Sequence, residues 1–382
     1  MRVFSCIVAI AFALSCPAHA DKQQPTQVNE QPKVEVVFVL DTTGSMSGLI
    51  AAAKDKIWAI ANTLATTKPT PYIKLGLIGY RDRRDAYITK RFDLSDDLDA
   101  IYKELMAFQA GGGGDTPESV NQGLHEAVAD ISWSKDPKTY QVIFLVGDCP
   151  PHMDYKDDVK YPETCQQAAK AGLIINTIQC GSNGGTEPVW RDIAKRAEGN
   201  YFRVEQSGGA ILPTTPFDKK LAKLAKDLDT TRVYYGTQKE IKTRLKKDEV
   251  AKEIYSKASV ESQARRSVFN GSAAGAWNFA GNNELINDIV NGKVMLEKIK
   301  KEKLPENLQK MSAKEQKEFC EAKLKKRQDI QKQIHALDAK RQKHLEDLVA
   351  KTKEDPKLDN GIFKSIQGQA AKKGIKYNKI SR

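Results

Sequence analysis

The sequence has 382 residues, a formal net charge of +12 and 29% charged residues. This length favours two domains rather than one. Beyond the first twenty residues no apolar stretch approaches the roughly 20 residues that a membrane-spanning helix needs, so we expect the rest of the chain to be soluble.

The charge is distributed unevenly along the chain. Residues 219–382 contain 39 Lys and Arg against 22 Asp and Glu, a net charge of +17, whereas residues 1–218 carry −5. The break near residue 218 is a candidate domain boundary, and the basic part can attract an anionic partner. We favour a simpler interpretation, in which helices of mixed Lys and Glu present solvated faces.

The N-terminus has the features of a cleavable signal peptide. A positive start precedes an apolar run at 3–14, and Ala18-His19-Ala20 offers the small residues of a cleavage site before Asp21. These features predict export to the periplasm or the medium. A transmembrane anchor is the alternative, but the apolar run is short for one.

A lipid anchor on Cys16 is a third interpretation of this segment. The residues before Cys16 fit a lipidation signal poorly, because Ala13 stands where a larger aliphatic residue is usual. We therefore expect no lipid at Cys16.

Strands and helices alternate after a polar lead at 21–32. In chain order we predict a strand at 34–40, a helix at 47–64, strands at 73–80 and 87–94, helices at 96–108 and 117–131, a strand at 141–147, a helix at 164–171, a strand at 173–179, a helix at 187–197, a strand at 201–204 and a helix at 216–229. The first of these strands is an almost unbroken apolar run, as in strands buried on both faces. The alternation predicts an α/β fold with a mostly parallel sheet over residues 33–230.

The strand signal fades in residues 231–382, which we expect to form a basic, largely α-helical C-terminal region. Helices are predicted at 237–264, 283–299, 312–351 and 360–371, with a loop at 270–283. The segment 312–351 carries only a thin and irregular apolar stripe. It reads as one long charged helix or a hairpin, since a true coiled coil has a more regular seam.

Oxygen-bearing side chains follow the first predicted strand and recur in two later loops. Asp41, Thr43 and Ser45 lie on the turn into the first helix, Thr116 ends a glycine-rich loop, and Asp148 follows the strand at 141–147. The carboxyl ends of parallel strands meet at one edge of a sheet, where ligands bind. Carboxylates and hydroxyls suit a hard cation such as Mg²⁺. The alternative is that Asp41 and Ser45 only cap the helix that follows.

This pattern resembles the metal-ion-dependent adhesion site of von Willebrand factor type A domains, and the order of elements from Val34 to Asp229 is similar to theirs. The resemblance implies a Rossmann-like sheet flanked by helices. It also implies that Mg²⁺, or alternatively Mn²⁺ or Ca²⁺, binds at the residues just named. One coordination position would accept an acidic side chain of a protein ligand, a binding function without catalysis. Thr43 departs from the family's usual serine but keeps the hydroxyl. The runs 108–111 and 148–155 resemble a bacterial exported subfamily.

Further polar residues near the predicted site have weaker signals. Arg81 and Asp82 follow the second strand and either set partner specificity or belong to a solvated hairpin. His152, with the acidic residues at 154, 157 and 158, can ligate a second metal, but their spacing matches no familiar site, so a polar loop is favoured.

Four cysteines, Cys149, Cys165, Cys180 and Cys320, follow the signal segment, and export permits disulfides among them. Cys165 opens a helix and Cys180 ends the next strand, so a bridge between these two is predicted. Cys149 is the competing partner, and free thiols are the remaining alternative.

We do not expect an enzyme. The sequence contains no phosphate-binding Gly-x-x-x-x-Gly-Lys loop and no Gly-x-Ser-x-Gly elbow. Metal-dependent hydrolysis of the haloacid-dehalogenase type is the alternative, but Thr43 stands where those enzymes need a second Asp. A different possibility is that the basic tail binds an anionic envelope component. Nucleic acid is not expected, because no aromatic residues interleave with the lysines.

Overall fold

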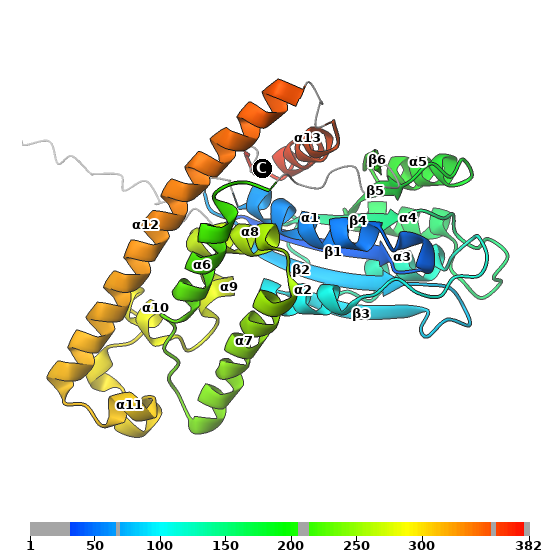
Figure 1. Ribbon diagram of the computed structural model, residues 1–382. Coiled ribbons are helices and arrows are strands. Elements are labelled where there is room, and N and C mark those ends of the chain that lie inside the picture. Colours follow the sequence, from blue (N-terminus) through cyan, green and yellow to red (C-terminus); the bar gives the residue numbers. More distant parts are fainter. Residues whose placement is uncertain (1–30, 66–68, 205–213, 353–356, 378–382) are drawn as a thin grey trace, which may run out of the picture. The chain divides into compact units, whose positions relative to one another are not determined.

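In this computed structural model, six strands of the described residues form one sheet, in the order β3-β2-β1-β4-β5-β6 (Figure 1). The strands are β1 (Lys33–Asp41), β2 (Tyr72–Tyr80), β3 (Thr89–Ser95), β4 (Tyr140–Gly147), β5 (Ile174–Cys180) and β6 (Tyr201–Val204). Neighbouring strands are parallel, except that β3 runs antiparallel to β2 at the edge. The predicted α/β fold with a mostly parallel sheet is confirmed.

Both faces of the central strands β1, β4 and β5 are buried, and side chains alternate between the two faces along each strand. Val36 and Phe38 of β1 enter one apolar core, and Val37 and Val39 enter the other. Helices α1 (Leu49–Leu64) and α2 (Leu98–Ala107) cover the first face. Helices α3 (Val120–Ala129), α4 (Tyr161–Ala171) and α5 (Thr186–Arg196) cover the second. The central strands β1 and β4 therefore lie between two layers of helices, with their carboxyl ends at one edge.

The rest of the described chain is helical, as predicted. Its helices are α6 (Asp218–Asp229), α7 (Gln238–Lys257), α8 (Val260–Gly271), α9 (Ala276–Ala280), α10 (Leu285–Val290), α11 (Glu306–Gln309), α12 (Ala313–Thr352) and α13 (Lys357–Ala371). The continuous helix predicted at 237–264 is wrong. Ser259 begins a new helix there, since its hydroxyl accepts a hydrogen bond from the Ser262 amide.

Two other predictions for this region need correction. The predicted loop at 270–283 contains the short helix α9, which ends at Gly281, where φ is +63°. The helix predicted at 283–299 is only the short α10, which stops just before Gly292 at φ +68°. Glycine adopts this left-handed conformation at little steric cost, so both residues end helices readily.

Helix α12 is one continuous helix of 40 residues, not a hairpin. It contacts α6, α8 and α10 along its length (Figure 1). Ile330 and Ile334 pack against Leu221 and Leu228 of α6 in a separate apolar cluster. The sparse apolar positions of α12 are thus those that meet these helices.

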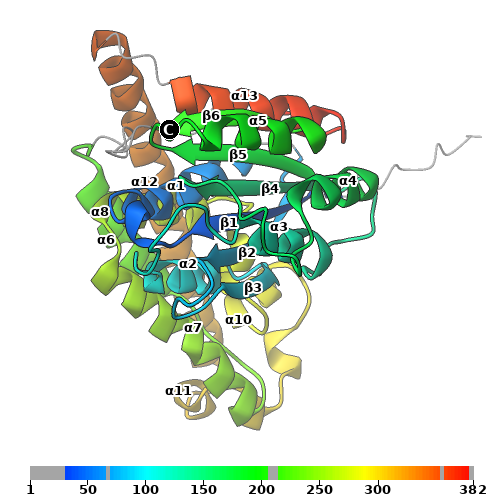
Figure 2. The ribbon, with the colours of Figure 1, turned by 90° about the vertical axis from the view of Figure 1, so that its right-hand side faces the viewer.

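Helix α13, near the end of the chain, packs on the sheet beside β6 (Figure 2). Ile362, Phe363 and Ile366 join the same core as α1 and α2. The side chain of Gln369 exchanges hydrogen bonds of 2.8 and 3.1 Å with Asn176 of β5. A helix from beyond residue 231 therefore completes one face of the sheet.

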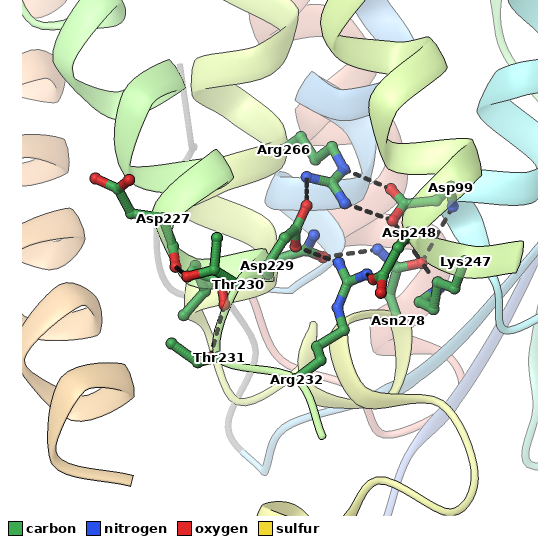
Figure 3. A network of polar contacts seen from close by, with 12 residues as sticks. Asp99, Asp227, Asp229, Thr230, Thr231, Arg232, Lys247, Asp248, Arg266 and Asn278 are labelled. Atoms are coloured by element: carbon green, nitrogen blue, oxygen red, sulfur yellow. Dashed lines mark hydrogen bonds and ion pairs between the residues drawn. The ribbon is translucent and has the colours of Figure 1, made fainter. Parts of the chain in front are cut away.

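A buried polar network joins α2 to α6, α7 and α8 (Figure 3). Its centre is an ion pair between Asp99 and Arg266, and Asp229 and Lys247 lie against this pair. The network links helices on both sides of residue 230, where the predicted α/β fold ends.

The structure describes residues 31–65, 69–204, 214–352 and 357–377. The predicted signal peptide, Cys16 and nearly all of the polar lead lie outside these residues. No helix within them is both long and apolar enough to cross a membrane.

Candidate metal centre

Two strand ends bring Asp41 and Asp148 together. β1 and β4 are parallel with Leu40 opposite Val146, so the residues that follow these positions leave the sheet side by side. Gly147 permits the approach, because a Cβ atom there would stand 2.9 Å from the Cβ of Asp41. The sheet itself therefore positions both carboxylates.

Close polar contacts connect four of the five predicted ligands. The Thr43 hydroxyl donates to Asp41 Oδ1 at 2.6 Å and lies 3.0 Å from the Ser45 hydroxyl. Ser45 Oγ donates in turn to Asp148 Oδ1 at 3.0 Å. The two hydroxyls and two carboxylates thus face one another across a few ångströms.

Thr116, the fifth predicted ligand, lies on the exposed side of this group. Its hydroxyl is 3.9 Å from the thiol of Cys149, the neighbour of Asp148. The glycine-rich loop before it is fixed to the first loop, since the Gly44 amide donates to the Gly112 carbonyl at 3.1 Å. All five predicted residues therefore lie at the same edge of the sheet.

The electrostatics of the group favour a cation. Asp41 is fully buried, and its Oδ2 has no hydrogen-bond partner among the described residues. Burial raises the pKa of Asp41 to about 7; the hydrogen bonds from Thr43 act in the opposite direction, and the charge of Asp148 adds to the increase. A divalent cation would both satisfy the unpaired oxygen and offset the crowded negative charge. The donor set, carboxylate and hydroxyl oxygens, fits such an ion.

The helix-capping alternative is not supported. The residue before α1 is Gly48, which makes no side-chain cap. Asp41 Oδ1 instead accepts hydrogen bonds from the amide and the hydroxyl of Thr43. Asp41 and Ser45 therefore organise the loop itself rather than the helix.

Glu118 is a residue of the site that sequence reasoning missed. Its carboxylate is buried and its Oε2 is unpaired within the described chain. Burial raises its pKa to about 9, and the charges of Asp41, Asp82 and Asp85 add to this. Its place directly after Thr116-Pro117 was visible in the sequence, but its burial against other carboxylates was not.

Arg81 and Asp82 hold loops together and do not project freely from the surface. Arg81 donates to the backbone carbonyls of Thr42 at 3.1 Å and Gln109 at 2.7 Å. Asp82 is buried and accepts a 2.9 Å hydrogen bond from Ser119. Both side chains have structural contacts that would be lost if they turned toward a partner.

The acidic residues expected around His152 separate into two groups. Asp157 and Asp158 pair with Arg83 at 2.8 and 2.7 Å. His152 instead contacts Asp154 and lies beside Asp82, a residue of another loop. The spacing of residues 152–158 could not reveal this grouping.

The predicted disulfide between Cys165 and Cys180 is not formed. All four cysteines of the described chain are buried, free thiols. Cys165 belongs to the core on one face of the sheet and Cys180 to the core on the other. The prediction placed both at the upper edge, but the sheet separates their side chains.

Comparison with known proteins identifies the domain. The family model described as von Willebrand factor A domain matches residues 35–215. An ariadne-like RING finger protein of Acanthamoeba polyphaga mimivirus is 26% identical over 125 residues, 33% of this chain and 12% of that protein. The alpha-protein kinase vwkA of Dictyostelium discoideum is 28% identical over 120 residues, 31% of this chain and 19% of that protein. The matched segment thus spans less than a fifth of either relative.

Solved structures that match part of this chain include that of proximal thread matrix protein 1 from the mussel byssus with a zinc-occupied MIDAS motif. That match has 17% identity and a TM-score of 0.37, and it covers 46% of this chain and 42% of the other. The SpRpn10 VWA domain matches with 16% identity and a TM-score of 0.36, over 48% of this chain and 95% of the other. With the family match and the six-stranded sheet together, residues 35–215 of this chain are a von Willebrand factor A domain.

Proposed function

We propose that this protein binds a divalent cation, Mg²⁺ or Mn²⁺, at Asp41, Thr43, Ser45, Thr116 and Asp148. The bound ion then captures an acidic side chain of a protein ligand. The observation that carries the proposal is the row of close oxygen contacts from Asp41 through Thr43 and Ser45 to Asp148, together with the unpaired Oδ2 of buried Asp41.

The exposure of the ligands supports a binding role. Asp41 and Thr43 are buried, whereas Ser45 and Thr116 are exposed. The closed side holds the ion through the chain's own oxygens, and the open side leaves a coordination position within reach of a carboxylate from another protein. Mg²⁺ readily keeps such exchangeable positions, because it binds few protein ligands and several waters.

The donor set favours binding over hydrolysis. A phosphatase of the haloacid-dehalogenase type needs a second Asp two positions after the first, and Thr43 occupies that position. The hydroxyl of Thr43 is engaged with Asp41 Oδ1 and Ser45 Oγ. We place this binding function outside the cytoplasm, because residues 1–20 have the pattern of a signal peptide.

The first test is calorimetric titration of metal-free protein with MgCl₂ and MnCl₂. Ser45→Ala and Thr116→Ala remove hydroxyl ligands at exposed positions, so both should weaken binding by tenfold or more while the protein stays folded. Ser47→Ala is the matched control, since Ser47 is an exposed serine of the same turn that is no ligand. Equal metal affinity in the wild type and in an Asp41→Ala/Ser45→Ala double variant would refute the proposal.

The second test addresses the ligand protein. A pull-down from envelope extract should retain a partner with Mg²⁺ present and release it with EDTA. Thr116→Ala should lose the partner, and Ser47→Ala should keep it. Retention that is unaffected by EDTA but falls steeply with salt would instead assign binding to the basic tail.

A further inference from the structure

A second group of metal-ligating side chains lies at the same sheet edge but shares no residue with the site described above. It consists of Asp82 after β2, Asp115 in the glycine-rich loop and His152 after β4. One ligand atom from each lies within 4.8 Å of the others. The group therefore draws one residue from each of three loops.

His152 provides the observation that points to a ligand. The residue is only 5% exposed, and its Nε2 has no hydrogen-bond partner within the described chain. Nε2 faces Asp82 Oδ2 at 3.6 Å, too far for a hydrogen bond. A buried imidazole nitrogen aimed at a carboxylate oxygen without bonding to it leaves a gap that a cation can fill.

The other ring nitrogen of His152 is already committed. Nδ1 lies 2.8 Å from Asp154 Oδ1, and a carboxylate can only accept there, so Nδ1 carries the proton. In a neutral ring this leaves the lone pair on Nε2. Histidines that bind metals commonly donate their second N–H to a carboxylate in this way, which fixes the tautomer and the ring orientation.

Neighbouring side chains hold the ring and the carboxylate in place. The ring of Tyr155 stacks on His152, with centroids 4.0 Å apart, and the guanidinium of Arg83 covers Tyr155 at 4.1 Å. The Tyr155 hydroxyl donates to Asp82 Oδ2 at 2.9 Å, and Ser119 donates to Oδ1. Both ligands are thus oriented before any ion arrives.

The spacing suits a transition metal. With Zn–N and Zn–O distances near 2.0–2.1 Å, two ligands of a tetrahedral Zn²⁺ are separated by about 3.4 Å. The 3.6 Å between His152 Nε2 and Asp82 Oδ2 is close to this value. Imidazole nitrogen also favours Zn²⁺ and similar ions over Mg²⁺ and Ca²⁺, which prefer oxygen alone.

We propose that Asp82, Asp115 and His152 form a second metal site, with Zn²⁺ as the preferred ion and water in the remaining position. Asp154 is a positioning residue for His152 and does not touch the ion. This site is independent of the proposed adhesion site, which uses other residues and oxygen ligands only.

The test is titration of the metal-free full chain with ZnCl₂ in saturating MgCl₂, and in the Ser45→Ala background, so that zinc at the first site is suppressed. One zinc ion should bind in both conditions. His152→Asn keeps a donor near Asp154 but removes Nε2, and Asp115→Asn changes an exposed side chain with little risk to folding. Each should weaken zinc binding by tenfold or more.

Two further variants separate coordination from structure. Asp154→Asn should reduce zinc affinity by about 10–100-fold, as loss of a carboxylate behind a ligating histidine usually does. Asp157→Asn, in the same loop, alters a carboxylate that pairs with Arg83 and should leave zinc affinity unchanged. Co²⁺ in place of Zn²⁺ should give a visible absorption band that His152→Asn abolishes.

The possible results are distinct. Wild-type zinc affinity in both His152→Asn and Asp115→Asn overturns the second site, whatever happens at the first. Zinc binding that disappears with Ser45→Ala alone also overturns it, because the ion would then occupy the adhesion site. Loss in His152→Asn and Asp115→Asn with unchanged Mg²⁺ affinity supports it.

Discussion

Arg266 of α8 donates two hydrogen bonds of 2.7 Å to the two carboxylate oxygens of Asp99 on α2. Both residues are buried, with 1% and 0% of their surfaces exposed. Asp229, at the end of α6, accepts a further hydrogen bond from Arg266 at 3.1 Å (Figure 3). This bidentate ion pair joins α2 of the von Willebrand factor A domain to helices that follow the domain in the chain.

Breaking the pair should strongly destabilise the protein. Arg266→Met leaves the buried Asp99 carboxylate without its main partner, and such losses cost about 3–5 kcal/mol. The free energy of unfolding in urea measures this. Arg191→Met is the matched control, because Arg191 pairs with Glu187 at 2.8 Å on an exposed helix face. Such surface pairs contribute less than about 1 kcal/mol. Equal effects of the two variants would contradict a stabilising role for the buried pair.

The pair also predicts a dependence of stability on pH. Burial alone raises the pKa of Asp99, but the charge and hydrogen bonds of Arg266 outweigh it, so the net pKa lies below the ordinary value. In the unfolded chain the pKa of Asp99 is ~3.9. As the pH falls, the unfolded chain therefore binds a proton at Asp99 before the folded chain does. The stability due to ionised Asp99 is therefore present above about pH 4 and is lost below it.

Asp99→Asn isolates this contribution. The difference in unfolding free energy between wild type and Asp99→Asn should be constant from pH 7 to pH 5. It should narrow by about 1 kcal/mol by pH 3. Urea denaturation at each pH measures the difference, and one that stays constant down to pH 3 would show that the pKa of Asp99 is not lowered.

That the predicted ligand residues lie at one edge could be expected from sequence, because parallel strands place their carboxyl ends there. Asp41 and Asp148 each follow an apolar run, so their meeting depended only on strand order. The contact between Asp82 and His152 depends on how two loops fold, and no local pattern encodes that. The burial of Glu118 is likewise a property of its surroundings.

The wrong disulfide and the unforeseen position of α13 both follow from tertiary packing. Cys165 lies on α4, which covers one face of the sheet, whereas the side chain of Cys180 at the end of β5 enters the core on the other face. The helical pattern of α13 was visible in the sequence. Its packing on the sheet was not, because it depends on a long-range match of Ile362 and Ile366 with the core.

Gly112 should be needed for the first metal site, whereas Gly114 should not. Gly112 has a φ of +75°, and a Cβ there would stand 2.2 Å from Asp85 Oδ1. Left-handed backbone costs an L-residue about 1–2 kcal/mol before any clash. Gly112→Ala should therefore lower the melting temperature and, by shifting the loop that carries Thr116, weaken Mg²⁺ binding.

Gly114→Ala is the matched control for this substitution. A Cβ at Gly114 meets nothing within 4 Å, and its φ is not positive. Calorimetric titration should give wild-type Mg²⁺ affinity for Gly114→Ala. If both alanine variants bind Mg²⁺ like the wild type, the glycine-rich loop does not position a ligand.

The cysteines should behave as protected thiols. Burial raises the pKa of Cys165 and of Cys149 to about 12, so little thiolate forms at neutral pH. The thiols of native protein at pH 8 should react slowly with Ellman's reagent. After denaturation, the four thiols of the described chain should react at once. Mass mapping of non-reduced peptides that finds a Cys165–Cys180 bridge would contradict the separation of these residues by the sheet.

The packing of α13 on the sheet should depend on Gln369. Its Oε1 accepts hydrogen bonds from the Tyr140 hydroxyl at 2.8 Å and from Asn176 Nδ2 at 3.1 Å, and all three residues are buried. Gln369→Ala leaves both donors without this acceptor, and an unsatisfied buried group costs about 1–3 kcal/mol. Urea denaturation should show a loss of that size, while Lys364→Ala, at an exposed position of the same helix, should change little. Limited proteolysis should also release α13 more readily in Gln369→Ala. Equal protease resistance of the two variants would mean that the apolar contacts of Ile362 and Ile366 hold the helix without this polar contact.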